Sequence, residues 1–279
     1  MSVRTSSVLT CVLSCLIAVS RPAAAGTELP MAVVPADGVI RLTDYGYRHW
    51  GPEVLHYRVD TSRFRPGKLV LLDGDGKAVP FQIKDNVLTF VAGVEKGQSV
   101  SFTLAASEKD RSAENSALRS RTVGDSLEIA NEHFTLRMPR PQEKVFNEPV
   151  SARQVPPPIL AWRQHGFDFA GGARLLTERR VASLQTRIAQ DGPASVVYEA
   201  HYRFAPAGEY LWRVRVSDGL RVAVVTEEFD FGEITDGQDL LMLGIGEKWQ
   251  PQQVGFVENR KLVLHPTTAF VAEKTKQQA

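Results

Sequence analysis

From residue 39 onward the sequence falls into short runs of alternating apolar and polar residues, each bounded by glycine, proline, aspartate or asparagine. The clearest run, 210–216, alternates large apolar side chains with Leu211, Arg213 and Arg215. Successive side chains of a strand point to opposite faces, so this period of two predicts half-buried β-strands. No segment carries the sustained i, i+3, i+4, i+7 apolar pattern of an amphipathic helix. The chain is therefore predicted to be all-β.

Turn sequences between these runs favour antiparallel hairpins. The segment Asp73-Gly74-Asp75-Gly76 separates two apolar runs, and Asp-Gly pairs adopt the positive φ that tight hairpin turns need. A calcium loop is the alternative interpretation, but the third ligand and the distant glutamate of an EF-hand are missing. The predicted fold class is a small N-terminal β-barrel or sandwich followed by a larger antiparallel β-sandwich.

The first 25 residues have the layout of a secretory signal peptide. Arg4 precedes an apolar run at 8–19, small residues follow, and no acidic residue occurs before the expected cleavage after Ala25. A membrane anchor needs about 20 apolar residues, and this run is shorter. Lipidation at Cys15 is a further alternative, although the apolar run continues past it. We therefore expect a secreted or periplasmic protein.

The composition of the remaining chain predicts two domains joined by a linker. Residues 26–107 are predicted to form the small β-barrel domain, and 123–279 the larger sandwich domain. The segment 108–122 is polar and without apolar periodicity, which is typical of a linker. A proline-rich stretch at 139–158 is expected to be a surface loop, because proline cannot donate to a sheet ladder.

Charge and cysteine content exclude several classes of function. Both cysteines lie in the predicted signal, so the mature chain would hold no disulfide and no catalytic thiolate. Removing Arg4 and Arg21 leaves 31 basic residues (33 minus 2) against 32 acidic ones. This balance gives no basic stripe for nucleic acid. No second apolar segment is long enough to span a membrane after signal cleavage.

Motifs that would identify a reaction are absent from the sequence. No glycine-rich phosphate loop, no His-Glu-x-x-His and no Gly-x-Ser-x-Gly occurs, and the six histidines are scattered singly. A zinc site needs three or four converging ligands. We therefore expect no metal and no cofactor, and the catalytic residues, if there are any, remain unassigned.

The candidate ligand-binding residues are aromatic and basic. Trp50 and Tyr47 lie in a loop-like aromatic cluster at 45–52, and Trp162 and His165 follow the proline-rich stretch. Exposed aromatic rings are typical platforms for sugars, whereas packing in a core is the alternative for each tryptophan. Arg213 and Arg215 share one face of a strand and could grip acidic sugars through bidentate contacts. The alternative for this arginine pair is the solvated face of a half-buried strand.

Three stretches resemble parts of known carbohydrate-active proteins. The hairpin at 68–82 resembles that of the N-terminal β-barrel domain of exo-acting rhamnogalacturonan lyases. The sequence Leu-Glu-Ile-Ala-Asn-Glu-His-Phe-Thr-Leu at 127–136 is similar to the opening strand pair of galactose-mutarotase-like β-sandwiches, and 208–229 is similar to a later meander of the same sandwich. In that architecture a helical α/α toroid follows and is expected to supply much of the active site. The chain has no such segment before Ala279, so no catalytic residue is carried over.

Three hypotheses about function follow. The first is a non-catalytic β-domain portion of a polysaccharide-processing protein of lyase or glycosidase ancestry, which docks carbohydrate on aromatic and arginine-bearing loops. The second is an autonomous carbohydrate-active enzyme of lyase or epimerase type, which needs His165 or His201 within reach of Glu228 or Arg213. The third is a structural or adhesive envelope protein with a protein partner.

Overall fold

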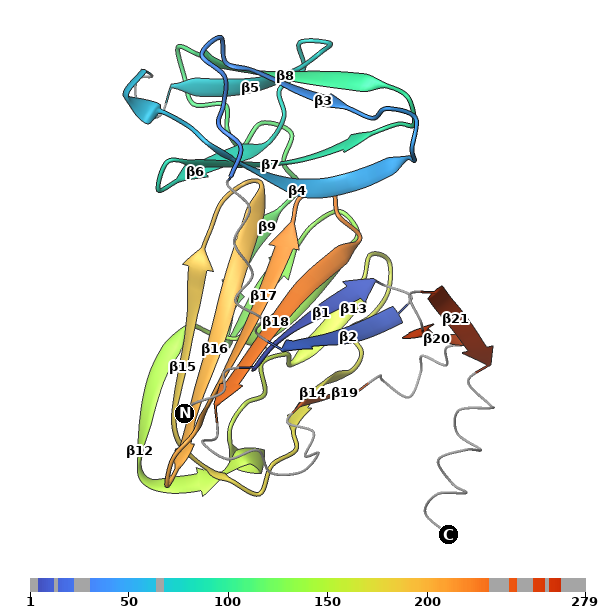
Figure 1. Ribbon diagram of the computed structural model, residues 1–279. Coiled ribbons are helices and arrows are strands. Elements are labelled where there is room, and N and C mark those ends of the chain that lie inside the picture. Colours follow the sequence, from blue (N-terminus) through green and yellow to red (C-terminus); the bar gives the residue numbers. More distant parts are fainter. Residues whose placement is uncertain are drawn as a thin grey trace.

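The computed structural model describes residues 5–12, 15–22, 31–63, 68–230, 241–244, 253–258 and 261–266, with side chains described at 31–62 and 68–230. Apart from two short 3-10 helices, Thr61–Arg63 and Ala152–Gln154, the elements are strands (Figure 1). The prediction of an all-β fold with antiparallel sheets is confirmed. The cleavage expected after Ala25 lies outside the described residues.

The N-terminal part is a small sandwich of two three-stranded sheets. One sheet has the order β3-β8-β5 and the other β4-β7-β6. The strands are β3 (Val39–Thr43), β4 (Trp50–Arg58), β5 (Leu69–Asp73), β6 (Phe81–Lys84), β7 (Val87–Val94) and β8 (Ser99–Ala106). Leu71 and Leu104 from the first sheet and Phe90 from the second are buried in one cluster. The predicted alternation is visible in β8, where Phe102 and Leu104 are buried and their neighbours are not.

The larger sandwich packs a seven-stranded sheet, order β12-β15-β16-β17-β18-β1-β2, against a four-stranded sheet, order β13-β11-β10-β9. The first sheet contains β12 (Gln142–Ser151), β15 (Arg180–Gln190), β16 (Ser195–Ala205), β17 (Glu209–Ser217), β18 (Val222–Asp230), β1 (Thr5–Val12) and β2 (Cys15–Pro22). The second contains β9 (Arg119–Val123), β10 (Ser126–Ala130), β11 (Phe134–Pro139) and β13 (Ala161–Gln164). Two further pairs are β14 (Gly172–Leu175) with β19 (Leu241–Gly244), and β20 (Gln253–Glu258) with β21 (Lys261–Pro266).

Aromatic side chains on the inner face of the seven-stranded sheet form much of the large core. Trp212 is fully buried, and its ring meets that of Tyr198 edge-on with centroids 6.4 Å apart. Tyr202 and Tyr210 stack on adjacent strands with centroids 5.9 Å apart. The alternation predicted for 210–216 is confirmed, since Tyr210, Trp212, Val214 and Val216 are buried and the residues between them are only half-buried.

Two segments differ from the sequence prediction. The proline-rich stretch contains β12, which pairs with β15 at the edge of the large sheet. Its register shifts between Val145 and Val150, and Pro149 lies in that irregular part, where a missing amide donor is tolerated. The end of the expected linker forms β9, which pairs with β10.

The two sandwiches meet through polar side chains of β6 and the β15–β16 hairpin. The side-chain oxygen of Gln82 accepts from the backbone amide of Ser195 at 3.0 Å, and its amide nitrogen donates to the Ser195 hydroxyl at 3.1 Å. Lys84 Nζ donates to the Ala189 carbonyl at 2.9 Å. These contacts hold the β4-β7-β6 sheet of the small sandwich over the end of the large sheet (Figure 1).

Candidate functional site

An exposed aromatic loop connects β3 to β4 in the small sandwich. The exposed fractions of Tyr45, Tyr47 and Trp50 are 84%, 81% and 38%. Three aromatic rings within six residues form an apolar surface that the core does not use. We call residues 44–50 the aromatic loop. Its sequence candidates, Tyr47 and Trp50, are therefore both accessible to a ligand.

A nearly buried carboxylate, Asp44, holds this loop in place. One oxygen accepts from the backbone amides of Gly97 at 2.7 Å and Gly46 at 2.9 Å, and the other accepts from the Trp50 indole at 3.1 Å. The Gly97 hydrogen bond is the largest cause that lowers the pKa of Asp44; burial opposes it, and the bonds from Trp50 and Gly46 add to it. The sequence analysis did not identify Asp44, although Asp followed by glycine at i+2 is a local turn signal.

Charged side chains border the aromatic loop. The Arg48 guanidinium lies over the Trp50 ring, 3.9 Å from its centroid. His49 Nδ1 lies 2.7 Å from a carboxylate oxygen of Glu95 on the neighbouring β7–β8 turn. One face of the Trp50 ring is thus covered by a cation, and the loop presents hydrogen-bonding groups beside its apolar rings.

The other aromatic candidate, Trp162, is placed differently. It lies on β13, is half-buried and packs against the large core. His165 lies in the turn after β13, where it is exposed and its Nδ1 is 2.7 Å from the Glu132 carbonyl oxygen. Trp162 is therefore partly a packing residue, and it belongs to the large sandwich whereas Trp50 belongs to the small one.

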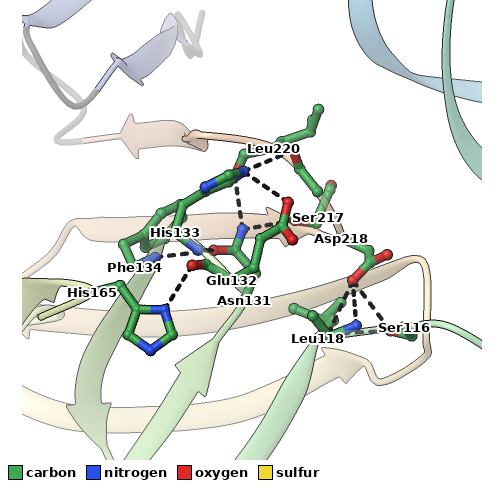
Figure 2. Close-up of polar contacts among 12 residues, drawn as sticks. Ser116, Leu118, Asn131, Glu132, His133, Phe134, His165, Ser217, Asp218 and Leu220 are labelled. Atoms are coloured by element: carbon green, nitrogen blue, oxygen red, sulfur yellow. Dashed lines mark hydrogen bonds and ion pairs between the residues drawn. The ribbon is translucent and has the colours of Figure 1, made fainter.

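The turn that contains Glu132 is fixed by Asn131, as Figure 2 shows. The Asn131 amide donates to the backbone carbonyls of Ser217 and Leu220, and its oxygen accepts from the amides of His133 and Phe134. All these bonds join the β10–β11 turn to the β17–β18 turn or close the turn itself. The cluster is accordingly a structural junction that ties the two sheets together.

The arginine candidates lie on the outer face of the seven-stranded sheet. Arg213 Nε donates to Glu199 at 2.7 Å, and its Nη1 lies 3.5 Å from Glu228. Arg187 binds the second oxygen of Glu199 at 2.7 Å. Desolvation raises the pKa of Glu199, but the hydrogen bonds from both arginines outweigh it, so the pKa lies below its ordinary value. Arg213 therefore forms salt bridges with two carboxylates, whereas Arg215 has no carboxylate partner among the described residues.

One acidic group behaves in the opposite way. Glu227, on the inner side of β18, accepts a short hydrogen bond from the hydroxyl of Tyr210. Burial raises the pKa of Glu227, and the hydrogen bond from Tyr210 offsets only part of this effect. The pair combines a carboxyl that favours protonation with a buried phenol, which is a feature of proton-transfer sites.

In the described hydrogen bonds, the histidines expected of an autonomous enzyme contact groups other than Glu228 and Arg213. His201 Nε2 lies 3.1 Å from Glu209, although the register places His201 and Glu228 on either side of Leu211 on one face of the sheet. His165 binds the backbone of the β10–β11 turn, which belongs to the other sheet. Within the described part of the chain, no three His, Cys, Asp or Glu side chains are grouped as metal ligands would be.

A scan against models of protein families and a search of curated proteins both found no match. Among the described residues, no helix has the length and hydropathy needed to cross a membrane.

The sequence candidates consequently lie in three places. Tyr47 and Trp50 share the aromatic loop, Trp162 and His165 share β13 and its turn, and Arg213 and Arg215 share β17. Of the three, the aromatic loop combines the greatest exposure with a backbone fixed by a buried carboxylate.

Proposed function

We propose that the protein docks carbohydrate through the aromatic loop of its small sandwich, as a non-catalytic part of a polysaccharide-processing system. The observation that carries the proposal is the pair of Tyr45 and Tyr47 rings, both more than four-fifths exposed, on a loop that Asp44 fixes. The negative face of an aromatic ring attracts the polarised C–H groups of a sugar ring, so stacking is favourable.

The hydrogen bonds that fix the backbone of the aromatic loop also favour ligand binding. Ordering a flexible loop on binding costs free energy, and a loop already held by three hydrogen bonds avoids most of that cost. The resemblance of the hairpin at 68–82 to the β-barrel domains of rhamnogalacturonan lyases agrees with a role in handling polysaccharide. Secretion, expected from the first 25 residues, would give access to such polymers.

The test is calorimetric titration of the purified chain with rhamnogalacturonan oligosaccharides, with cellohexaose and mannohexaose as neutral comparators. We expect Tyr45→Ala and Tyr47→Ala each to weaken binding by about five- to tenfold, because each ring contributes roughly 1 kcal/mol of stacking. Phe167→Ala is the matched control, since Phe167 is 67% exposed but lies outside the loop. Unchanged affinity in both tyrosine variants, or no binding of any of these glycans, would refute the proposal.

A second candidate function, proton transfer by an autonomous enzyme, is favoured by one observation. Glu227 is a carboxyl with a raised pKa next to the Tyr210 hydroxyl, which suits a general acid. Assay of the purified chain for release of unsaturated or reducing sugars tests it. Activity that Glu227→Gln abolishes would favour the enzyme, and absence of turnover in the wild type would rule against it.

A further inference from the structure

The boundary between the two sandwiches contains a row of aligned polar residues. On the small sandwich, His56 pairs with Thr89 and Thr89 with Gln82, so the three side chains share one face of the β4-β7-β6 sheet. That face is turned toward the large sheet, because Gln82 binds Ser195 and Lys84 binds the Ala189 carbonyl. We call this boundary the seam.

Arg215 lies at the seam on the large sheet. It is two residues before Ser217 on the same face of β17, and Ser217 pairs directly with Ser195, the partner of Gln82. Two residues along a strand span about 7 Å, so Arg215 lies close to the contact between the sandwiches. Figure 1 shows β4, which carries His56, passing beside the ends of β17 and β18.

The positive charge of Arg215 acts on the His56 imidazole across the seam. Burial is the main cause that lowers the pKa of His56, and the nearby charge of Arg215 lowers it further. His56 Nδ1 is 3.0 Å from the Thr89 hydroxyl, which leaves its Nε2 for another partner. His56 is accessible to solvent and Arg215 is half-buried.

The charge of Arg215 is not balanced by the described residues. No described side chain or backbone oxygen accepts a hydrogen bond from its guanidinium, and its neighbour Arg213 adds a second positive charge. The carboxylates on the same face, Glu199 and Glu228, are already bound to Arg213, and Glu199 also to Arg187. The Arg215 side chain is half-buried and its guanidinium has no described acceptor, so a bound anion would pair a positive charge that no described carboxylate balances.

We propose that the seam is a binding site for an oxyanion group, held by the Arg215 guanidinium and the His56 imidazole. A guanidinium presents parallel N–H donors that match the two oxygens of a carboxylate or phosphate. His56 would donate one more hydrogen bond from Nε2, supplied by the other sandwich. Boundaries between domains are common sites for small ligands. This site is separate from the aromatic loop and does not depend on glycan docking.

The experiment titrates the full purified chain with inorganic phosphate, acetate and glucuronate at constant ionic strength, with chloride as reference, and follows thermal denaturation and heat of binding. We expect a saturable rise in Tm for at least one of the three. Phosphate alone would identify a tetrahedral anion, whereas glucuronate exceeding acetate would identify a sugar acid. Arg215→Gln should weaken binding about tenfold or more, since it removes the charge and the paired donors.

Arg203→Gln is the matched control, because Arg203 is exposed on the same face at the other end of β16. It should leave binding unchanged. If Arg215→Gln fails to fold, NMR of the wild type replaces it, with phosphate expected to shift the ring signals of His56 and the Nε signal of Arg215. No saturable response to any of the three anions, equal binding by Arg215→Gln, or unmoved His56 and Arg215 signals would overturn the proposal.

Discussion

Replacement of Asn131 by alanine is expected to be among the most damaging changes in the large sandwich. The side chain is 5% exposed and takes part in four hydrogen bonds (Figure 2). It donates to the carbonyls of Ser217 and Leu220 at 2.9 and 2.7 Å, and accepts from the amides of His133 and Phe134 at 2.9 and 3.1 Å. Alanine would leave all four backbone groups without this partner.

The expected magnitude follows from these four bonds. A net contribution of about 1 kcal/mol for each gives a loss of about 4 kcal/mol in the free energy of unfolding. The Phe134 amide is buried and cannot recover its hydrogen bond from water, which keeps the estimate from falling far below this value. With a urea m value of about 2 kcal/mol per M, the denaturation midpoint should fall by about 2 M.

Urea denaturation followed by far-UV circular dichroism measures this shift. Asn131→Asp is an informative second variant, because it keeps the acceptor for His133 and Phe134 but loses both donors, and should also be strongly destabilised. Ser126→Ala is the control, since it removes one exposed hydrogen bond to Val123 and should cost less than about 1 kcal/mol. A loss below about 1 kcal/mol for Asn131→Ala would show that the junction is not a major source of stability.

Two further predictions concern the buried carboxylate of Glu128 and the contact between Gly192 and Gln82 at the boundary of the two sandwiches. Desolvation raises the pKa of Glu128, but hydrogen bonds from Arg137 and Arg121 outweigh it and hold the pKa below its ordinary value. The resulting contribution to the free energy of unfolding is present above the unfolded-state pKa and is lost as pH falls through the folded-state pKa. Glu128→Gln should therefore lower the free energy of unfolding by about 1–3 kcal/mol at pH 7 and by less in acid. Urea denaturation at several pH values measures this difference, and a loss that does not change with pH would contradict the prediction. Gly192→Ala would place its Cβ against the side-chain amide of Gln82 and should lower Tm, whereas the same change in a Gln82→Ala background should cost little. Additive effects in this double-mutant cycle would refute the contact.

Much of the fold could be predicted because its signals are local. The alternation of Leu127 and Ile129, followed by Phe134 and Leu136, places each side chain on a face without any tertiary information, and β10 and β11 form as expected. The strand β12 could not be predicted in this way. Its prolines argue against a sheet, and only the tertiary structure shows that it lies at an edge with an irregular register.

The candidate site was predictable only in part, because its supporting contacts are distant in sequence. The aromatic residues at 45–50 were visible as a cluster, but the Gly97 amide that helps to fix Asp44 lies 53 residues away. The roles of Arg213 and Arg215 could not be separated, since both occupy the same face of one strand. Their difference arises from the placement of Glu199 and Glu228 on the neighbouring strands.

The contact between Gln82 and the β15–β16 hairpin has a consequence for sequence drift. Gln82 accepts hydrogen bonds from the backbone amides of Ala194 and Ser195, which every residue except proline provides. This main-chain part of the attachment would persist through substitutions at these two positions, but Ala194 and Ser195 are both buried, so only small side chains fit there. Gly192 is the exception, since only the absence of a side chain leaves room for Gln82. The hairpin should accordingly keep glycine at 192 and small side chains at 194 and 195.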